Sequence, residues 1–327
     1  MSDLTVAILD CNFPSTDLER SIVQSAGAGF VLGNCRTEEE VVAFAAAADA
    51  CIVQYAPLTR RVLTQLQRCR VVARYGIGVD SIDVPAATDE GIWVTNVPGF
   101  CKIELAEHTM AMVLGFARRL NRLDRSVHRG EWETIGVMRP TRRLSELTLG
   151  LVGFGQVGRE VASRARAFGL RVIATAPRTD AATMASYNVE KVSLEELLRA
   201  ADFVSLHLPL TAESRHLLDA ERLALLKPSA YLINTSRGPI VDEAALIAAL
   251  QAGRLAGAGL DVLEREPPAS DNPLLGMENV VITPHAAYYS DDALEFLQTS
   301  VAEEVVRVLR GDRPRSPVNP DVVPRRW

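Results

Sequence analysis

The sequence predicts an α/β protein built from two doubly wound parallel sheets. Three observations support this fold class. The chain has 327 residues, more than a single hydrophobic core usually supports. Hydrophobic residues make up 48% and charged residues 23%, as in folded globular proteins. Short apolar strand patterns alternate with helical ones along nearly the whole chain, and such alternation indicates parallel pairing, because each parallel strand needs a crossover connection.

The first α/β unit is predicted within residues 1–99. Strands are expected at 6–9, 50–53, 71–73 and 93–95, and helices at 17–26, 38–48 and 83–90. A long apolar helix is predicted over 103–123. A basic, irregular segment follows over 129–143, where Gly130, Gly136 and Pro140 interrupt any regular period.

The alternation then starts again and predicts a second unit. Its strands are expected at 148–152, 171–175, 203–208, 230–233, 256–260 and 280–283, and its helices at 159–168, 195–200 and 242–252. A final helix is predicted over 290–309, ending at Gly311.

Composition argues against several classes of protein. The formal net charge of −6 is unsuited to nucleic-acid binding, which needs a basic face. The one basic run, at Arg139, Arg142 and Arg143, is interpreted as a solvated arm or a subunit contact. No apolar stretch is long enough to span a bilayer, and the N-terminus does not resemble a signal peptide, so a cytoplasmic protein is expected. The five cysteines form no C-x-x-C pair, and no metal site is expected.

The strongest local motif is Gly153-Phe154-Gly155-Gln156-Val157-Gly158, which follows an apolar strand and leads into a helical pattern. In that context the motif predicts a dinucleotide-binding loop. Gly153 would make the tight turn, Gly155 would let the backbone approach the pyrophosphate, and Gly158 would allow close packing of helix and strand. A plain strand–turn–helix connection is the alternative interpretation.

The end of the next strand bears on which dinucleotide binds. An acidic residue there would bind the ribose 2′-hydroxyl of NAD, but the chain has Ala176-Pro177-Arg178-Thr179. Because a guanidinium suits a 2′-phosphate, Arg178 favours NADP(H) over NAD(H). Asp180 would replace the missing acid if the strand were longer, and Arg178 would then be an ordinary surface residue.

Three polar residues each follow a predicted strand, at the edge of a sheet where ligands bind: Arg237, Glu266 and His285. A histidine can donate a proton near neutral pH, a neighbouring carboxylate favours its charged form, and an arginine can bind a carboxylate and polarise a carbonyl. Together they fit the reduction of a 2-keto acid by a hydride from a nicotinamide. His207 is expected to border the cofactor, whereas His108 is assigned a structural role.

These motifs resemble the D-isomer-specific 2-hydroxyacid dehydrogenases over nearly the whole chain, most specifically at Thr235 to Gly238, Asp261 to Pro267 and Pro284-His285. The segments 72–80 and 284–290 resemble the branch that contains the C-terminal-binding proteins. The resemblance implies a Rossmann nucleotide-binding domain, 100–289, inserted in a flavodoxin-like substrate-binding domain, 1–99 and 290–327. It also implies a homodimer with contacts from the long helix and the 129–143 arm.

The resemblance further implies that Arg237 binds substrate, that Glu266 tunes His285, and that His285 is the acid/base. Residues expected at the cofactor are Gly153, Gly155, Gln156, Val157, Gly158, Ala176, Arg178, His207, Pro209, Thr235, Ser236, Asp261 and Ala287. Residues expected at the substrate are Arg74, Gly76, Ile77, Gly78 and Tyr288.

Two positions depart from the family pattern. The family usually carries aspartate where Ala176 stands, and the C-terminal-binding proteins carry tryptophan where Tyr288 stands. The sequence therefore predicts an NAD(P)-dependent oxidoreductase, with NADP(H) favoured, that interconverts a small 2-keto acid, such as glyoxylate or hydroxypyruvate, and its D-2-hydroxy acid. A dinucleotide-sensing regulatory scaffold with co-repressor-like partner binding and little catalytic activity is the alternative.

Overall fold

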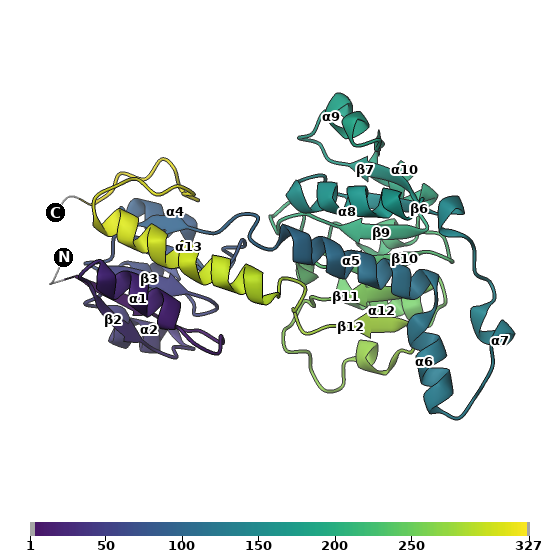
Figure 1. Ribbon diagram of the computed structural model, residues 1–327, viewed down its shortest axis with the longest axis horizontal. Coiled ribbons are helices and arrows are strands. Elements are labelled where there is room, and N and C mark those ends of the chain that lie inside the picture. The colour runs from purple at the N-terminus through teal and green to yellow at the C-terminus, as the bar shows by residue number, and fades with distance from the viewer. Residues whose placement is uncertain (1–3, 326–327) are drawn as a thin grey trace. The chain divides into compact units, whose positions relative to one another are not determined.

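The computed structural model describes residues 4–325 and divides the chain into two compact units (Figure 1). The first unit comprises the residues up to Phe100 together with those from Ser290 onward, and the second comprises Cys101–Tyr289. The sequence analysis predicted boundaries at 99/100 and 289/290.

The first unit is built on a five-stranded sheet in which all paired strands are parallel. Its spatial order is β2-β1-β3-β4-β5, the order of flavodoxin-like folds. The strands are β1 (Thr5–Ile8), β2 (Gly29–Leu32), β3 (Ala50–Val53), β4 (Val71–Arg74) and β5 (Trp93–Thr95).

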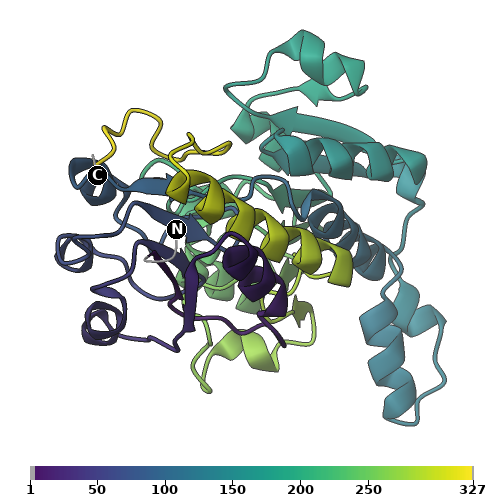
Figure 2. The ribbon, with the colours of Figure 1, turned by 60° about the vertical axis from the view of Figure 1, so that its left-hand side comes forward.

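Helices cover both faces of this sheet, and each face has its own apolar cluster. One face packs against α2 (Glu38–Ala45), α3 (Arg60–Leu63) and α4 (Val84–Asp89). The other packs against α1 (Asp17–Ser25) and α13 (Asp291–Leu309), which lie side by side (Figure 2). The C-terminal helix therefore completes the core of the N-terminal unit.

The second unit is built on a seven-stranded parallel sheet in the order β12-β11-β10-β9-β6-β7-β8. This is the 3-2-1-4-5-6 arrangement of Rossmann folds with one further strand. The strands are β6 (Thr148–Val152), β7 (Arg171–Thr175), β8 (Glu190–Lys191), β9 (Phe203–Leu206), β10 (Tyr231–Asn234), β11 (Gly257–Leu260) and β12 (Val280–Ile282). The predicted fold class is confirmed.

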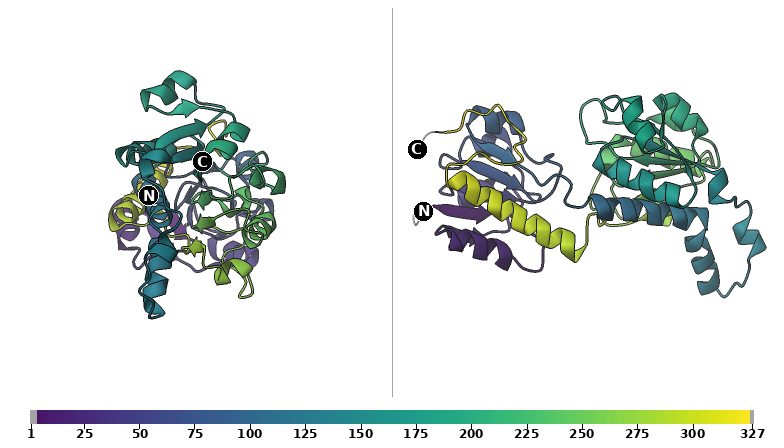
Figure 3. Two further views of the ribbon diagram at one scale, coloured as in Figure 1. Left: turned by 90° about the vertical axis from the view of Figure 1, so that its right-hand side faces the viewer. Right: turned by 45° about the horizontal axis from the view of Figure 1, so that its top comes forward.

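Two helical layers enclose this second sheet. On one face α5 (Lys102–Ala117) packs along α8 (Gln156–Ala167) (Figure 3), and α9 (Ala181–Ser186) contributes Met184 to the apolar cluster of this face. The opposite face is covered by α10 (Leu194–Ala200), α11 (Ala220–Leu223) and α12 (Glu243–Gln251). Three short 3₁₀ turns complete the unit: Leu144–Glu146, Gly238–Ile240 and Pro273–Gly276.

The prediction of one helix over 103–123 is wrong, because the helix breaks at Arg119, which has a left-handed φ of +52°. Beyond it, α6 (Leu120–His128) and the short α7 (Ile135–Met138) project from the body of the second unit (Figures 1 and 3). Strand β9 also ends at Leu206, two residues earlier than predicted, which leaves His207 on the loop.

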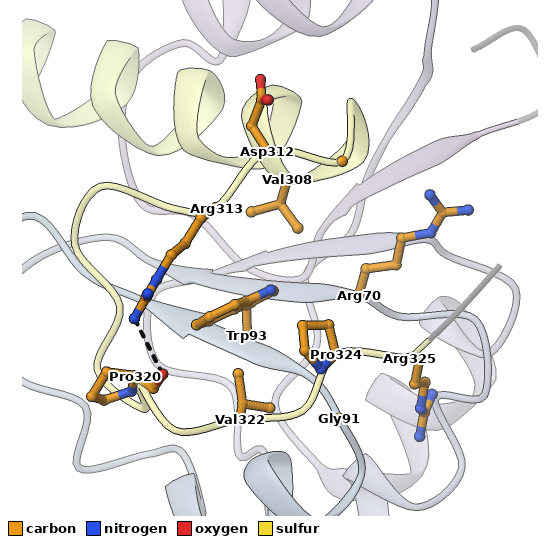
Figure 4. Close-up of a pocket in the computed structure, with 11 residues that line it drawn as sticks. Arg70, Gly91, Trp93, Val308, Asp312, Arg313, Pro320, Val322, Pro324 and Arg325 are labelled. Carbon is orange, nitrogen blue, oxygen red and sulfur yellow. Dashed lines mark hydrogen bonds between the residues drawn. The ribbon is translucent and has the colours of Figure 1, made fainter.

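The C-terminal tail closes the β5 edge of the first sheet. The Val318 amide donates to the Val94 carbonyl, and the Asn319 carboxamide oxygen accepts from the Val94 amide. A pocket of about 420 Å³ lies between this tail, β5 and the end of α13, with Trp93 at its centre and Arg313 bonded to the Pro320 carbonyl (Figure 4). The described residues that line the pocket all belong to the first unit. Within residues 4–325, no helix has both the length and the apolar character needed to cross a membrane.

Candidate functional site

Arg237, Glu266 and His285 lie at the carboxyl edge of the seven-stranded sheet. They follow β10, β11 and β12, which are adjacent and parallel, so their loops leave the sheet at the same edge. The His285 Nδ1 atom lies 2.7 Å from Glu266 Oε2. The side chains of His285 and Glu266 are 30% and 37% exposed, so a substrate could reach them.

The pairing of Glu266 with Nδ1 defines the orientation of the His285 ring. A carboxylate at Nδ1 places a proton there, and among the described residues Nε2 has no hydrogen-bond partner. The Nε2 atom is therefore the nitrogen available to exchange a proton with a ligand. The backbone of His285 has a left-handed φ of +52°, and its amide donates to the Asp261 and Thr283 carbonyls, each at 2.9 Å.

The Asp261 carboxylate holds the loop that carries His285. Its side chain is buried and accepts hydrogen bonds from the Ala286 amide at 2.8 Å, the Ala287 amide at 3.0 Å and the Thr283 hydroxyl at 2.6 Å. The Thr283 hydroxyl also lies 3.0 Å from His108 Nε2 on α5. Asp261, predicted to contact cofactor, thus positions His285, and His108 contributes to the same network.

The charges around Glu266 explain its ionisation. Burial is the largest single influence and raises the pKa of this carboxyl, but the hydrogen bond and charge of His285, the Leu263 amide and the charge of Arg237 together outweigh it. The pKa of Glu266 is therefore below its ordinary value, and the group is a carboxylate at neutral pH. Arg237, held by Nη1 to the Ser236 carbonyl at 2.7 Å, is close enough to contribute to this shift.

The glycine loop has the geometry that dinucleotide binding requires. Gly153 has a φ of +105°, and a Cβ atom there would lie 2.2 Å from the His207 carbonyl oxygen. A Cβ on Gly158 would lie 2.6 Å from the Gly153 carbonyl oxygen, whereas a Cβ on Gly155 would have no atom within 4 Å. Gly155 is followed by α8, whose first residues Gln156 and Val157 present backbone amides at the helix N-terminus. The open space at Gly155 fits a pyrophosphate against those amides.

The end of β7 carries Ala176 and Arg178 in place of an acidic residue. Ala176 is buried, and Arg178 is exposed two residues later. Asp180 caps α9, accepting from the Thr183 amide at 2.7 Å and the Thr183 hydroxyl at 2.8 Å. Strand β7 ends at Thr175, so the longer strand that Asp180 would need in order to replace the missing acid is not present.

The other predicted cofactor residues lie on the loops after β9 and β10. The His207 Nε2 lies 3.0 Å from the Ser205 hydroxyl, and burial lowers the pKa of His207 to about 4. Pro209 is exposed on the same loop, and its carbonyl accepts from Ser214. The Ser236 hydroxyl donates to the Leu206 carbonyl at 2.5 Å, and the Thr235 hydroxyl bonds that of Thr109 at 3.1 Å. These hydroxyls therefore fasten the loops to their neighbours.

The predicted substrate loop of the first unit follows β4. The Arg74 side chain turns back to donate to the Tyr75 carbonyl, over Gly76, whose φ is +132°. A Cβ on Gly76 would overlap the Arg74 guanidinium. The Ile77 carbonyl accepts from the Asn96 side chain at 2.6 Å, and Ile77 and Gly78 are accessible. Tyr288 belongs to the second unit, where its ring centroid lies 6.5 Å from that of His285.

A second histidine–carboxylate pair was not predicted. His216 Nε2 lies 2.6 Å from Glu264 Oε1, in the loop that also carries Glu266. The two residues are 48 positions apart, and neither has a distinctive motif around it. The one sequence signal is that Glu264 lies two residues from Glu266.

Comparisons with known proteins bear on the same region. Residues 110–287 match the family model described as D-isomer specific 2-hydroxyacid dehydrogenase, NAD binding domain. The chain is 42% identical over 271 residues to a glyoxylate reductase of Korarchaeum cryptofilum, covering 82% of this chain and 81% of that protein.

Two further similarities extend over most of the chain. It is 40% identical over 294 residues to a D-3-phosphoglycerate dehydrogenase of Methanocaldococcus jannaschii, covering 88% of this chain and 55% of that relative, so the chain spans about half of the relative's length. The solved structure of an acyclic imino acid reductase in complex with NADPH and D-Arg superposes with a TM-score of 0.86 at 29% identity, covering 96% of this chain and all of that one. The chain belongs to the D-isomer-specific 2-hydroxyacid dehydrogenase family.

Proposed function

We propose that the protein interconverts a small 2-keto acid, such as glyoxylate or hydroxypyruvate, and its D-2-hydroxy acid with a nicotinamide dinucleotide. The observation that supports this most directly is the pairing of His285 with Glu266 at 2.7 Å, beside Arg237, in the unit that carries the glycine loop. The glyoxylate reductase relative supports a small substrate.

The three residues have different chemical tasks in this proposal. When bound, the nicotinamide supplies a hydride to the keto carbon or takes it back. His285 donates a proton from Nε2 to the carbonyl oxygen during reduction and accepts it during oxidation. Glu266 holds the ring and stabilises its charged form, and Arg237 binds the substrate carboxylate and polarises the carbonyl.

The residues after β7 support NADP(H) over NAD(H). Ala176 leaves no carboxylate to bind a ribose 2′-hydroxyl, Asp180 is engaged as a helix cap, and Arg178 is exposed where a 2′-phosphate would bind. The NADPH complex of the imino acid reductase shows that a protein of similar structure accepts this dinucleotide.

A homodimer is part of the proposal. Large apolar side chains on α6 and the following arm are exposed: Val127 by 50%, Trp132 by 90% and Ile135 by 64%. A second copy of this chain would remove that surface from water.

The test is a steady-state assay of the purified protein with glyoxylate, hydroxypyruvate and pyruvate, under NADH and NADPH separately. Reduction should be favoured at lower pH and oxidation at higher pH, because the proton on His285 is needed in one direction and must be absent in the other. Arg237→Ala should lower kcat/KM by about 10³-fold or more, as expected when a charge-assisted contact to substrate is lost.

The matched control is Arg171→Ala, which removes an exposed arginine on β7. Turnover by Arg237→Ala equal to that of this control would exclude the proposed role of Arg237. Dinucleotide binding without turnover of any keto acid would instead favour the regulatory scaffold.

A further inference from the structure

The loop that carries Glu266 also carries Glu264, which forms the second histidine–carboxylate pair with His216. The His216 Nε2–Glu264 Oε1 distance of 2.6 Å is shorter than the His285–Glu266 distance. Glu264 stands two residues before Glu266 on the same turn. The pair therefore contacts the candidate site through the backbone that carries Glu266.

Three chain segments lie next to one another around this pair: residues 216–218, the 238–240 turn and the turn that begins at Leu263. The His216 amide donates to the Pro239 carbonyl at 2.8 Å, and the Leu218 amide donates to the Ile240 carbonyl at 3.0 Å. On its other side the same 238–240 turn lies against Leu263, since a Cβ on Gly238 would come within 1.9 Å of the Leu263 carbonyl oxygen. The segment directly after Arg237 is thus held between His216 and the turn that leads to Glu266.

Glu264 is held from a further direction by α12. The Glu264 amide donates to Glu243 Oε2 at 3.0 Å, and the Glu243 amide donates to Glu264 Oε1 at 3.4 Å. Asn272 donates to Glu243 Oε1 at 2.8 Å. Within the turn, the Leu263 amide donates to Glu266 Oε1 at 3.0 Å, which leaves Oε2 for His285. Any displacement of residues 263–264 would therefore move the carboxylate that orients His285.

The exposure and the backbone conformation of His216 and Glu264 indicate that the pair positions the neighbouring turn and does not only stabilise the fold. The side chains of His216 and Glu264 are 44% and 34% exposed, and a pair this accessible to water stabilises a fold only slightly. Yet His216 has a left-handed φ of +50°, a conformation that is unfavourable for residues other than glycine. Such strain persists where the surroundings fix the residue, commonly beside functional sites.

We propose that His216 and Glu264 are positioning residues that fasten the turn over residues 263–266 to the loop after Arg237, so that Glu266 meets His285 in a reactive arrangement. The proposal rests on the proposed function. Neither residue is assigned a contact with substrate or cofactor.

The variants are chosen to distinguish an effect on the position of the 263–266 turn from a general loss of protein stability. Glu264→Ala removes the acceptor, and Glu264→Gln retains an oxygen that can accept from His216. His216→Asn removes the imidazole but keeps a residue that tolerates positive φ. The control is Arg171→Gln, which breaks an exposed pair of the same 2.6 Å length with Glu190.

The first measurement is amide hydrogen exchange on the full chain without ligand, followed at the Leu263 amide. In Glu264→Ala and His216→Asn this amide should exchange at least about tenfold faster than in wild type, because the turn opens locally. Glu264→Gln and the control should remain within about twofold. Unchanged exchange at Leu263 in both disruptive variants would overturn the proposal.

The second measurement is kinetics with the best keto acid. Glu264→Ala and His216→Asn should lower kcat about tenfold, with substrate KM and dinucleotide Kd changed by less than about twofold, since only the acid/base pair is disturbed. Glu264→Gln should restore kcat to within about threefold. The double variant Glu264→Ala/His216→Asn should have a kcat no lower than that of either single variant, as expected for residues that act as a unit.

The outcomes separate the two proposals. If wild type turns over no keto acid with either dinucleotide, the proposed function fails, whatever the exchange data show. If wild type is active but the disruptive variants keep kcat within twofold of the control, or lose kcat only in proportion to a fall in Tm that the control shares, the positioning role is refuted.

Discussion

Two histidines of the second unit stand in different electrostatic surroundings. His285 is half-buried and is hydrogen-bonded to the Glu266 carboxylate. His207 has the Ser205 hydroxyl as its partner, and burial lowers its pKa to about 4. At neutral pH His207 is therefore a neutral group beside the glycine loop.

This lowered pKa predicts a loss of stability in acid. A histidine in the unfolded chain has its ordinary pKa of 6.5, so between pH 6.5 and about 4 the unfolded chain binds a proton at His207 that the folded chain does not. Stability should be complete above pH 6.5 and fall by at most about 3 kcal/mol toward pH 4. His207→Gln lacks this contribution, so urea unfolding should show wild type losing more stability than the variant between pH 7.5 and 4.5. Parallel curves would contradict the expectation.

The exposed guanidinium of Arg178 predicts a change in cofactor preference. Arg178→Ala should raise the Kd for NADPH about 10- to 100-fold and change that for NADH less than about threefold, because only NADPH carries the 2′-phosphate.

Glu213 carries a charge of the opposite sign to that of Arg178. The Thr211 hydroxyl, the Glu213 amide and, least, the charge of Arg178 lower the pKa of Glu213, so it is a carboxylate near Arg178.

Glu213→Gln should therefore bind NADPH more tightly than wild type, since a repulsive charge is removed. Both changes are measured by fluorescence titration of the reduced dinucleotide. If Arg178→Ala weakened the binding of NADH and NADPH equally, a contact between Arg178 and the 2′-phosphate would be excluded.

At the level of residues, sequence reasoning found the side chains that follow strands. Arg237, Glu266 and His285 could be predicted because the ends of parallel strands meet at one edge. The contacts that hold these side chains in place could not be predicted from the sequence. The Asp261 carboxylate accepts from amides 25 and 26 residues away, and His108 reaches Thr283 from α5 across 175 residues. These pairings depend on the tertiary fold and leave no local pattern.

At the level of elements, the glycine loop offers a matched comparison. A Cβ on Gly155 meets open space, so Gly155→Ala should keep its Tm within about 2 °C of wild type while raising the dinucleotide Kd at least about tenfold, because the methyl group occupies the place of the pyrophosphate. A Cβ on Gly158 meets the Gly153 carbonyl at 2.6 Å, so Gly158→Ala should lose about 1–3 kcal/mol of stability. Thermal unfolding and dinucleotide titration of both variants test this. A large loss of stability in Gly155→Ala with unchanged affinity would contradict the assigned roles.

The elements that sequence analysis missed have physical reasons in common. Strand β2 is a four-residue edge strand whose apolar run is only Phe30 to Leu32, and β8 has only two residues, both charged, so neither gives a strong strand pattern. The break between α5 and α6 falls at Arg119, where no glycine or proline interrupts the helical pattern. The buried strands were predicted well, because burial on both faces requires apolar residues throughout.

At the level of the whole molecule, the chain leaves the first unit after Phe100 and rejoins it at Ser290. Local patterns predicted most of the strands and the longer helices of both units but not this return. The α13 helix looks like any other amphipathic helix, and its place against α1, β3 and β4 comes from tertiary packing. The return of the chain to the first unit was therefore predicted from the family resemblance. The matches of the chain confirm membership of that family.

The surface of α6 and the following arm predicts the assembly state. Trp132 and Ile135 are 90% and 64% exposed, and burying such side chains against a second copy would contribute about 1.5–3 kcal/mol each. Trp132→Glu/Ile135→Glu should therefore shift the protein from dimer to monomer in sedimentation equilibrium. The matched control is Phe168→Glu/Tyr187→Glu, which alters two aromatic residues of the same unit, 50% and 36% exposed, outside the arm. If wild type sediments as a monomer, or if both double variants remain dimers, the arm is not the dimer contact.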